Sequence, residues 1–208
     1  FGGGPPSGNY GNETESWNGP SWTELNNLNT NRYAAGQGGG TSTAAIAAGG
    51  SVSGGQTADT ETWNGSSWTE VNNLNTAREQ GGAAGTTTAG ILASGNTGSI
   101  TTNAETWDGT SWTEVNNLNA GRVDLRTSGN STLSIAFGGA LPSRTGATEF
   151  WNGTSWTEVG DMGTARAATA NGIGGATAAL AAGGSEPSQS AATEEWETSL
   201  SNKTITSS

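Results

Sequence analysis

Apolar and polar positions follow a pattern that repeats about every 45 residues along this chain. The clearest copy, residues 60–78, reads TETWNGSSWTEVNNLNTAR. The first Trp of each copy stands at Trp17, Trp63, Trp107, Trp151 and Trp196, so the steps are 46, 44, 44 and 45 residues. A fixed period of this size is typical of propellers and stacked arrays. We therefore expect recurring positions to be scaffold and function to lie where the copies differ.

Each copy predicts a β-hairpin. Residues 60–63 (TETW) and 66–71 (SSWTEV) are β-prone, and Asn64-Gly65 between them is a strong signal for a two-residue type I′ turn. With that turn, the indoles of Trp63 and Trp68 are diagonal neighbours on one face. A four-residue loop would instead place them directly opposite each other. Both alternatives keep the aromatic pair together.

Two further strands are expected before each hairpin. Short apolar runs ending in glycine occur at residues 44–50, 89–95, 133–139 and 178–184. Each follows a stretch rich in glycine and alanine, and such small side chains suit an inner strand that passes close to other backbones. Four antiparallel strands per unit predict an all-β fold, a β-propeller of four-stranded antiparallel blades.

The order of these residues resembles the kelch repeat. In one copy the pattern is carried by Arg78, Ser94-Gly95, Glu105, Trp107, Trp112 and Leu118. The period is shorter than that of kelch, the hairpin aromatic is Trp instead of Tyr, and the turn is Asn-Gly where kelch has Asp-Pro. Runs such as WNGTSWTEV also resemble, in texture, repeats of marine phage tail-fibre and other virion proteins. The resemblance covers essentially the whole chain and implies a single kelch-like propeller domain, residues 1–208.

About five kelch-like units are expected, called units 1 to 5 below. Their approximate bounds are residues 1–31, 32–77, 78–121, 122–165 and 166–208. Unit 1 is incomplete, because residues 1–4 match only the end of an apolar strand. An exposed strand edge there would recruit a partner, whereas preceding repeats would give six or seven blades. Residues 196–208 resemble a terminal cap, with Ser201 in place of the second Trp.

Composition narrows the functional classes. The chain has 7 Lys and Arg against 18 Asp and Glu, with no basic cluster, so we expect no nucleic-acid partner and no polybasic membrane contact. No apolar run approaches the ~20 residues of a transmembrane helix, so we expect no membrane insertion. His and Cys are both lacking, which removes the usual general base, the thiol nucleophile and most transition-metal ligands. We expect no enzymatic activity, no metal and no cofactor, although a glycosidase-like carboxylate pair stays open.

Two charged residues recur at fixed positions in the copies, and we expect both of these columns of equivalent residues to belong to the scaffold. A Glu stands two residues before the first Trp of each copy, and an Arg ten residues after the second. Because an active site need occur only once, the columns predict structural ion pairs that tie each unit to its neighbour. The members singled out are Glu61, Glu105, Glu149, Arg78, Arg122 and Arg166. The indoles are expected to pack between units, with sugar stacking as the alternative: Trp17, Trp22, Trp63, Trp68, Trp107, Trp112, Trp151, Trp156 and Trp196.

Candidate ligand-binding residues lie where the copies differ. Unit 4 carries Asp124 and Arg126 in place of small neutral residues, with Arg144 in the following loop. The alternative is a drifted repeat with a solvated salt bridge. The Asn-rich segments add Asn72, Asn73, Asn116 and Asn117, whose amides either grip ligand hydroxyls or form turns. These segments and the variable linking loops are expected to emerge on one face, where binding usually resides.

Together these features predict a non-enzymatic binding propeller that presents variable loops to a cell-surface glycan or protein. The setting expected is a phage fibre or another extracellular appendage, and therefore an extracellular or virion-surface location. The alternative is a structural module that docks to copies of itself or to other virion or surface proteins.

Overall fold

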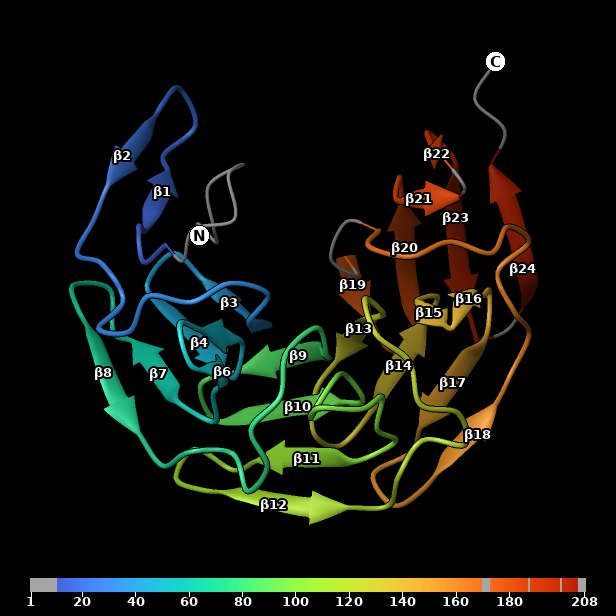
Figure 1. The fold of residues 1–208 in the computed structure, drawn as a ribbon. Helices are drawn as coiled ribbons and strands as arrows, with labels where there is room; N and C mark the ends of the chain where they lie inside the picture. Colours follow the sequence, from blue (N-terminus) through green and yellow to red (C-terminus); the bar gives the residue numbers. More distant parts are fainter. Residues whose placement is uncertain (1–10, 170–172, 187, 199, 206–208) are drawn as a thin grey trace.

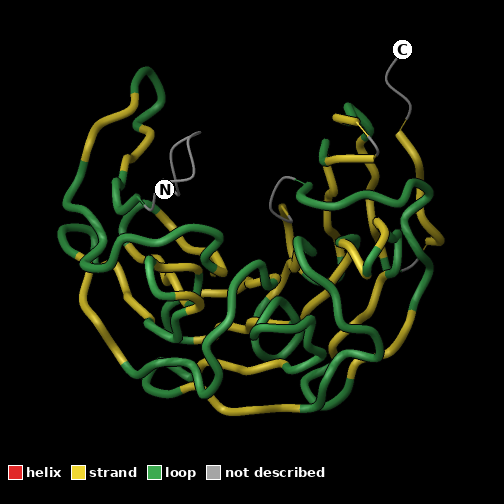
Figure 2. Tube along the Cα trace, viewed as in Figure 1, coloured by secondary structure: helices red, strands yellow, loops and turns green. Residues whose placement is uncertain are grey.

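The computed structural model of the chain describes residues 11–169, 173–186, 188–198 and 200–205. Within these ranges the protein is all-β, and strands alternate with loops without any helix (Figure 2). The expected strand at residues 1–4 lies outside the described residues. The four antiparallel strands predicted for one repeat are confirmed in units 2 to 5, where each sheet keeps the sequence order of its strands.

The strands of each unit are as follows. Unit 1 contributes the hairpin β1 (Glu15–Trp17) and β2 (Trp22–Glu24). Unit 2 contains β3 (Gly36–Thr41), β4 (Ala44–Ala48), β7 (Thr60–Trp63) and β8 (Trp68–Val71). Unit 3 contains β9 (Gly82–Thr86), β10 (Ala89–Ala93), β11 (Ala104–Trp107) and β12 (Trp112–Val115). Unit 4 contains β13 (Arg126–Gly129), β14 (Ser134–Phe137), β17 (Thr148–Trp151) and β18 (Trp156–Glu158). Unit 5 contains β19 (Ile173–Gly175), β20 (Ala178–Ala182), β23 (Thr193–Glu197) and β24 (Leu200–Ile205).

Three of the linking loops form small hairpins of their own, which were not predicted. They are β5 (Ser51–Val52) with β6 (Gly55–Gln56), β15 (Ala140–Leu141) with β16 (Ser143–Arg144), and β21 (Ser185–Glu186) with β22 (Ser188–Gln189). The segment expected to be a terminal cap contains β24, which pairs with β23 as the fourth strand of unit 5.

The sheets follow one another round an arc. Figure 1 shows the first strand of each sheet toward the middle of the arc and the last strand on the outside. Neighbouring first strands are in contact, β3 with β9, β9 with β13 and β13 with β19. Within the part of the chain that is described, the arc stays open between the β1–β2 hairpin and unit 5 (Figure 1).

The hairpin turn differs from the one first expected. Trp63 pairs directly with Trp68, so the loop has four residues, 64–67. The two-residue type I′ turn is therefore wrong and the four-residue alternative is confirmed. Gly65 has a positive φ of 95°, whereas Asn64 acts through its side chain. Its Oδ1 accepts hydrogen bonds of 2.9 Å from the backbone N–H groups two and three residues ahead. Asn is thus favoured here as a side-chain cap.

The indole pairs form the core between units. Each pair has ring centroids 5.4 to 5.5 Å apart. Trp107 and Trp112 of unit 3 pack against Ile46 and Leu74 of unit 2, and the indoles of unit 4 pack in the same way on unit 3. Units 1 to 3 therefore each bury the indole pair of the unit that follows. This burial is a major source of stability, because indoles carry large apolar surfaces.

The first indole pair is different. Trp17 is 51% exposed and Trp22 is 59% exposed, whereas Trp107 and Trp112 are 1% and 7% exposed. The pair in unit 1 nevertheless keeps the tilted geometry of the buried pairs. No preceding unit is present among the described residues to cover it. The expectation that all the indoles pack between units therefore does not hold for Trp17 and Trp22 in this structure.

Candidate functional site

The recurring Arg and Glu form buried ion pairs. In unit 3, Nη2 of Arg78 lies 2.6 Å from Oε1 of Glu105, and neither side chain is accessible to solvent. Arg78 also donates from Nη1 to the backbone carbonyl of Asn103, at 2.7 Å. Burial lowers the pKa of the Arg78 guanidinium, and the adjacent Glu105 carboxylate opposes that shift. Equivalent pairs join Arg32 to Glu61, Arg122 to Glu149, and Arg166 to Glu194.

The same carboxylates link neighbouring units. Oε2 of Glu105 accepts hydrogen bonds from the backbone N–H and the side-chain amide of Asn75, at 2.7 and 2.9 Å. Both Arg78 and Glu105 belong to unit 3, so the ion pair itself lies within one unit. The tie to the preceding unit runs through Asn75, the last Asn of the NNLN segment. Sequence reasoning did not single out this residue, although its recurrence as Asn29, Asn75 and Asn119 in units 1 to 3 could have done so. In unit 4 the position is Gly163, whose backbone N–H donates to Glu194.

The four candidate asparagines directly follow β8 and β12, the last strands of units 2 and 3. Nδ2 of Asn72 donates to the carbonyl of Thr110 at 2.8 Å, and Nδ2 of Asn116 donates to the carbonyl of Thr154 at 2.7 Å. Each contact reaches the hairpin turn of the next unit. Asn73 and Asn117 bond within their own units, to Asp59 and Asn103 respectively.

Asp124 and Arg126 lie at the start of β13, on the inner side of the arc (Figure 1). The structure therefore does not bring these two residues together with the candidate asparagines. Asn73 and Asn117 bond to residues of the linking loops, and the backbone N–H groups of Leu74 and Leu118 do the same. The Asn-rich segments and the linking loops therefore lie on one face of the arc, as expected.

That surface is built from the linking loops. The residue after each column Arg forms a β-bridge to the start of the linking loop of its own unit: Tyr33 with Ser51, Glu79 with Asn96, Val123 with Ala140, and Ala167 with Ser185. These bridges and the hairpins β5–β6, β15–β16 and β21–β22 form one side of the arc, called the loop face below. β15–β16 lies in front of β14 and β17 in Figure 1. The residues at these bridges vary between copies, so the loop face is where the units differ most.

A chain of backbone hydrogen bonds runs along the middle of the loop face. The N–H of Gln80 donates to the carbonyl of Ala34 at 3.1 Å, the N–H of Asp124 to that of Gln80 at 2.9 Å, and the N–H of Ala168 to that of Asp124 at 2.9 Å. All four residues have positive φ between 51° and 57°. A non-glycine residue in this region costs about 1 kcal/mol or more. The inter-unit hydrogen bonds offset that cost and hold each residue in place.

Polar side chains join neighbouring units on the loop face, and each junction uses a different contact. Gln56 of unit 2 donates to Glu79 of unit 3 at 3.1 Å. Gln80 of unit 3 donates to both carboxylate oxygens of Asp124 in unit 4, at 3.3 and 3.4 Å. The junctions are therefore chemically distinct.

Two arginines extend from unit 4 across to unit 5. Nε of Arg126 donates to the carbonyl of Thr169 at 2.8 Å, and its Nη1 donates to the carbonyl of Leu125 at 3.0 Å. Arg144 donates from Nε and Nη2 to Oγ of Ser185, at 2.9 and 2.6 Å. No ion pair joins Arg126 to Asp124, both of which are described, so the salt bridge of the drifted-repeat alternative is not formed between them. Burial lowers the pKa of Arg126, and attraction to Asp124 opposes that shift.

The loop face also carries apolar side chains in contact with solvent. Tyr33 is 53% exposed, Ile100 is 40% exposed and Leu141 is 44% exposed. Apart from the indoles of unit 1, these are the large apolar side chains that are exposed in the described ranges. All three stand at positions that differ between copies. The loop face therefore combines apolar contact area with amide, carboxylate, hydroxyl and guanidinium groups.

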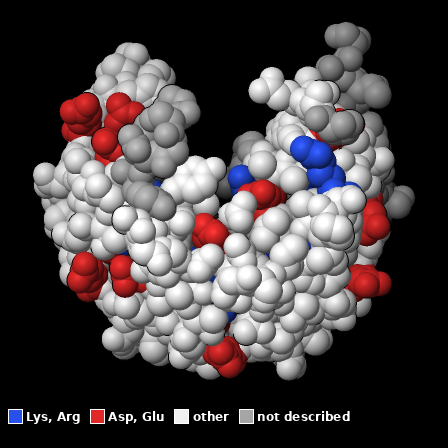
Figure 3. Space-filling model, in the orientation of Figure 1, with Lys and Arg blue, Asp and Glu red and all other residues white. Residues whose placement is uncertain are grey.

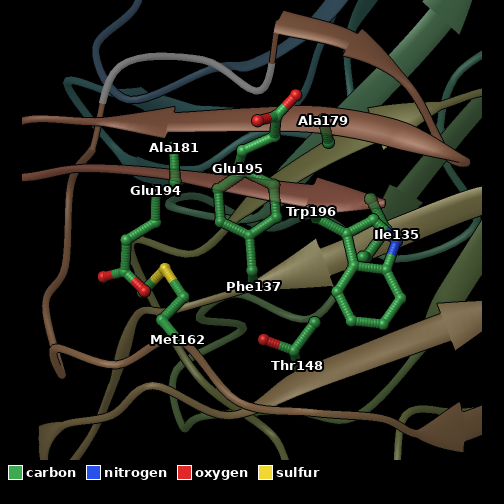
Figure 4. A pocket seen from close by; sticks show the side chains of 9 residues that line it. All are labelled: Ile135, Phe137, Thr148, Met162, Ala179, Ala181, Glu194, Glu195 and Trp196. Atoms are coloured by element: carbon green, nitrogen blue, oxygen red, sulfur yellow. The ribbon is translucent and has the colours of Figure 1, made fainter. Parts of the chain in front are cut away.

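A cavity between units 4 and 5 is a packing feature and not a ligand site. Figure 4 shows its lining: Ile135, Phe137, Thr148, Met162, Ala179, Ala181, Glu194, Glu195 and Trp196. Its volume of about 20 Å³ leaves room for roughly one water molecule. Ser201 replaces the second Trp of unit 5, while Phe137 and Met162 stand where units 2 and 3 have alanine and leucine. These two larger side chains of unit 4 line the cavity.

No protein-family model matches this chain, and none of the curated proteins is significantly similar to it. In the described ranges, no helix has the length and apolar character needed to span a membrane. Over the same residues, no cluster of three or more His, Cys, Asp or Glu side chains is arranged to hold a metal ion.

Proposed function

We propose that the chain folds as a kelch-like β-propeller. Support comes from the four-stranded units, the contacts between successive first strands, and the inter-unit hydrogen bonds in the middle of the arc. In such a propeller the recurring Arg, Glu, Asn and Trp side chains hold neighbouring units in register. The variable loops are then displayed on one rigid face.

We further propose that this loop face binds a partner and that the protein is not an enzyme. The observation that carries this proposal is the exposure of Tyr33, Ile100 and Leu141 on the loop face, at positions where the repeat is not constant. Exposed apolar groups flanked by polar side chains are typical of recognition surfaces. The partner proposed is a cell-surface glycan or protein, met by a phage fibre or another extracellular appendage.

Binding to arrays of glycans and of surface proteins tests this function. Tyr33→Ala should weaken capture of the partner without lowering the melting temperature. Ser66→Ala is a matched control, because Ser66 is exposed in the hairpin turn on the outer side of the arc. If neither array yields saturable binding, or if both variants bind as the parent chain does, the loop face is not the binding surface.

A second function, assembly, is favoured by the exposed indoles of unit 1. Trp17 and Trp22 have the geometry of pairs that are elsewhere covered by a preceding unit. At the other end of the arc, Leu180 of unit 5 is only half-buried, whereas its equivalents Ile46 and Ile91 are 2% and 1% exposed. The alternative proposal is that a repeat unit of another copy covers the indoles. Light scattering at increasing concentration tests it, and Trp17→Ser should abolish any association.

A further inference from the structure

Arg126 and Arg144 differ from the other arginines of the described chain. Arg32, Arg78, Arg122 and Arg166 are each buried against a Glu. Among the residues that the structure describes, no carboxylate lies within ion-pair distance of Arg126 or Arg144. Figure 3 shows the largest groups of basic side-chain atoms close together on the viewed face, beside acidic ones, and only small basic areas elsewhere on that face. The chain has a net charge of -11, so two neighbouring guanidinium groups without an ion-pair partner are unusual for it.

The fold brings the two arginines onto one surface. Arg144 pairs with Ala140 in the small hairpin, and Ala140 bridges to Val123, three residues before Arg126. Both side chains then reach the same part of unit 5. Arg126 bonds to Thr169 and Arg144 to Ser185. Ser185 bridges to Ala167, which stands two residues before Thr169, so the two contacts lie on adjacent segments of unit 5.

These guanidinium groups are positioned but not neutralised. Their hydrogen bonds go to two carbonyls and a hydroxyl, none of which carries a full charge. An arginine held in this way is preorganised to meet a planar carboxylate, since its donors match the spacing of two carboxylate oxygens. A bound anion would replace the water that partly buried Arg126 has lost.

The neighbouring groups suit a sugar better than a peptide. Gln80, which bonds to Asp124 two residues before Arg126, offers an amide, and Ser185 adds a hydroxyl beside Arg144. Such groups bond to the hydroxyls of a saccharide. Leu141, in the same hairpin as Arg144, is exposed and offers an apolar contact for a sugar ring.

We infer that the junction of units 4 and 5 on the loop face binds a saccharide that carries a carboxylate, such as a uronic-acid oligomer, through Arg126 and Arg144. This inference rests on the proposed binding function and names the ligand class that it would recognise. Asp124 limits the affinity, because its negative charge lies on the same surface as the incoming carboxylate.

Calorimetric titration of the whole chain with a hexauronate, compared with a neutral glucose hexamer, tests the inference. We expect the hexauronate to bind at least about tenfold more tightly, and Arg144→Gln to weaken it by about tenfold, the size of one charge-assisted hydrogen bond. Arg126→Gln should act in the same direction, with its melting temperature measured in parallel. Asp124→Asn should tighten binding, an effect that a merely structural role would not produce. Binding should also weaken with added salt.

The outcomes separate this inference from the proposed function. Equal binding of the neutral hexamer, or an unchanged affinity in Arg144→Gln, overturns the arginine site, while a glycan or protein whose binding depends on Tyr33 would still support the loop face. Equally tight, arginine-dependent binding of a hexaglutamate peptide overturns the saccharide class. The absence of binding to any probe or array overturns both proposals.

Discussion

Nη2 of Arg78 lies 2.6 Å from Oε1 of Glu105, and the two side chains are fully enclosed. Burying two charges costs several kcal/mol per ion, at least in order of magnitude, and only good geometry offsets it. Here Asn75 and Thr76 donate further hydrogen bonds to the carboxylate, and the carbonyls of Thr76, Ser94 and Asn103 accept from the guanidinium. The pair recurs in units 2 to 5, which indicates that it stabilises the scaffold and is not a single reactive site.

Glu105→Gln should therefore be strongly destabilising, because it leaves the buried guanidinium of Arg78 without a counter-charge. We expect a loss of about 3 to 5 kcal/mol in the free energy of unfolding, measured by urea denaturation. Arg144→Gln is the control, since an exposed arginine should contribute less than about 1 kcal/mol. Similar values for the two variants would show that the column is not structural.

Ala104→Thr should stabilise the protein. Nε1 of Trp112 donates to Oγ1 of Thr60 at 3.0 Å, and Nε1 of Trp68 donates to the equivalent Thr14 at 2.9 Å. In the next interface the equivalent residue is Ala104, and Nε1 of Trp156 is buried without a partner. A hydroxyl at position 104 should provide that partner and add about 1 kcal/mol to the free energy of unfolding.

Ala104→Val is the matched control for that prediction, since valine has nearly the shape of threonine but no hydroxyl. The difference between the two variants in urea denaturation isolates the hydrogen bond from any strain of added volume. If Ala104→Val were as stable as Ala104→Thr, the unpartnered indole of Trp156 would have no energetic consequence.

Asp108→Asn should reduce the loss of stability in acid. Hydrogen bonds from the backbone N–H groups of Ser111 and Thr110 lower the pKa of Asp108 from its usual value of 3.8. A carboxyl whose pKa is lowered by folding stabilises the protein above the unfolded pKa, and that contribution is lost as pH falls through the folded pKa. Asn supplies the same acceptor at all pH values, as Asn64 does in unit 2. Thermal melts below about pH 4 should therefore show a smaller decrease for the variant, and parallel curves would contradict this.

Much of the fold could be predicted from the sequence because its period and its alternation are strong signals. The apolar runs, the turn residues and the Trp pairs were enough to predict the order of the strands. The turn length could not be predicted in the same way, because Asn64-Gly65 suits two geometries. In the structure Asn64 caps the turn through its side chain, and only Gly65 needs the positive φ.

The middle of the loop face was beyond sequence reasoning. Ala34, Gln80, Asp124 and Ala168 share a positive φ, yet no glycine marks the position. Their conformation is imposed by hydrogen bonds between units, which a one-dimensional pattern does not reveal. For the same reason Asp124 and Arg126 could be singled out by their difference from other copies, but the contact of Arg126 with unit 5 could not be predicted.

The most direct test of the account compares two indoles of the same column, Trp107 and Trp17, by urea denaturation of their alanine variants. Trp107 packs against unit 2 and is 1% exposed, whereas Trp17 is 51% exposed. We predict that Trp107→Ala lowers the free energy of unfolding by about 3 to 5 kcal/mol, and Trp17→Ala by no more than about 1.5 kcal/mol, the value of an aromatic contact. Equal losses for the two variants would contradict the claim that each unit is held by burying the indoles of the next.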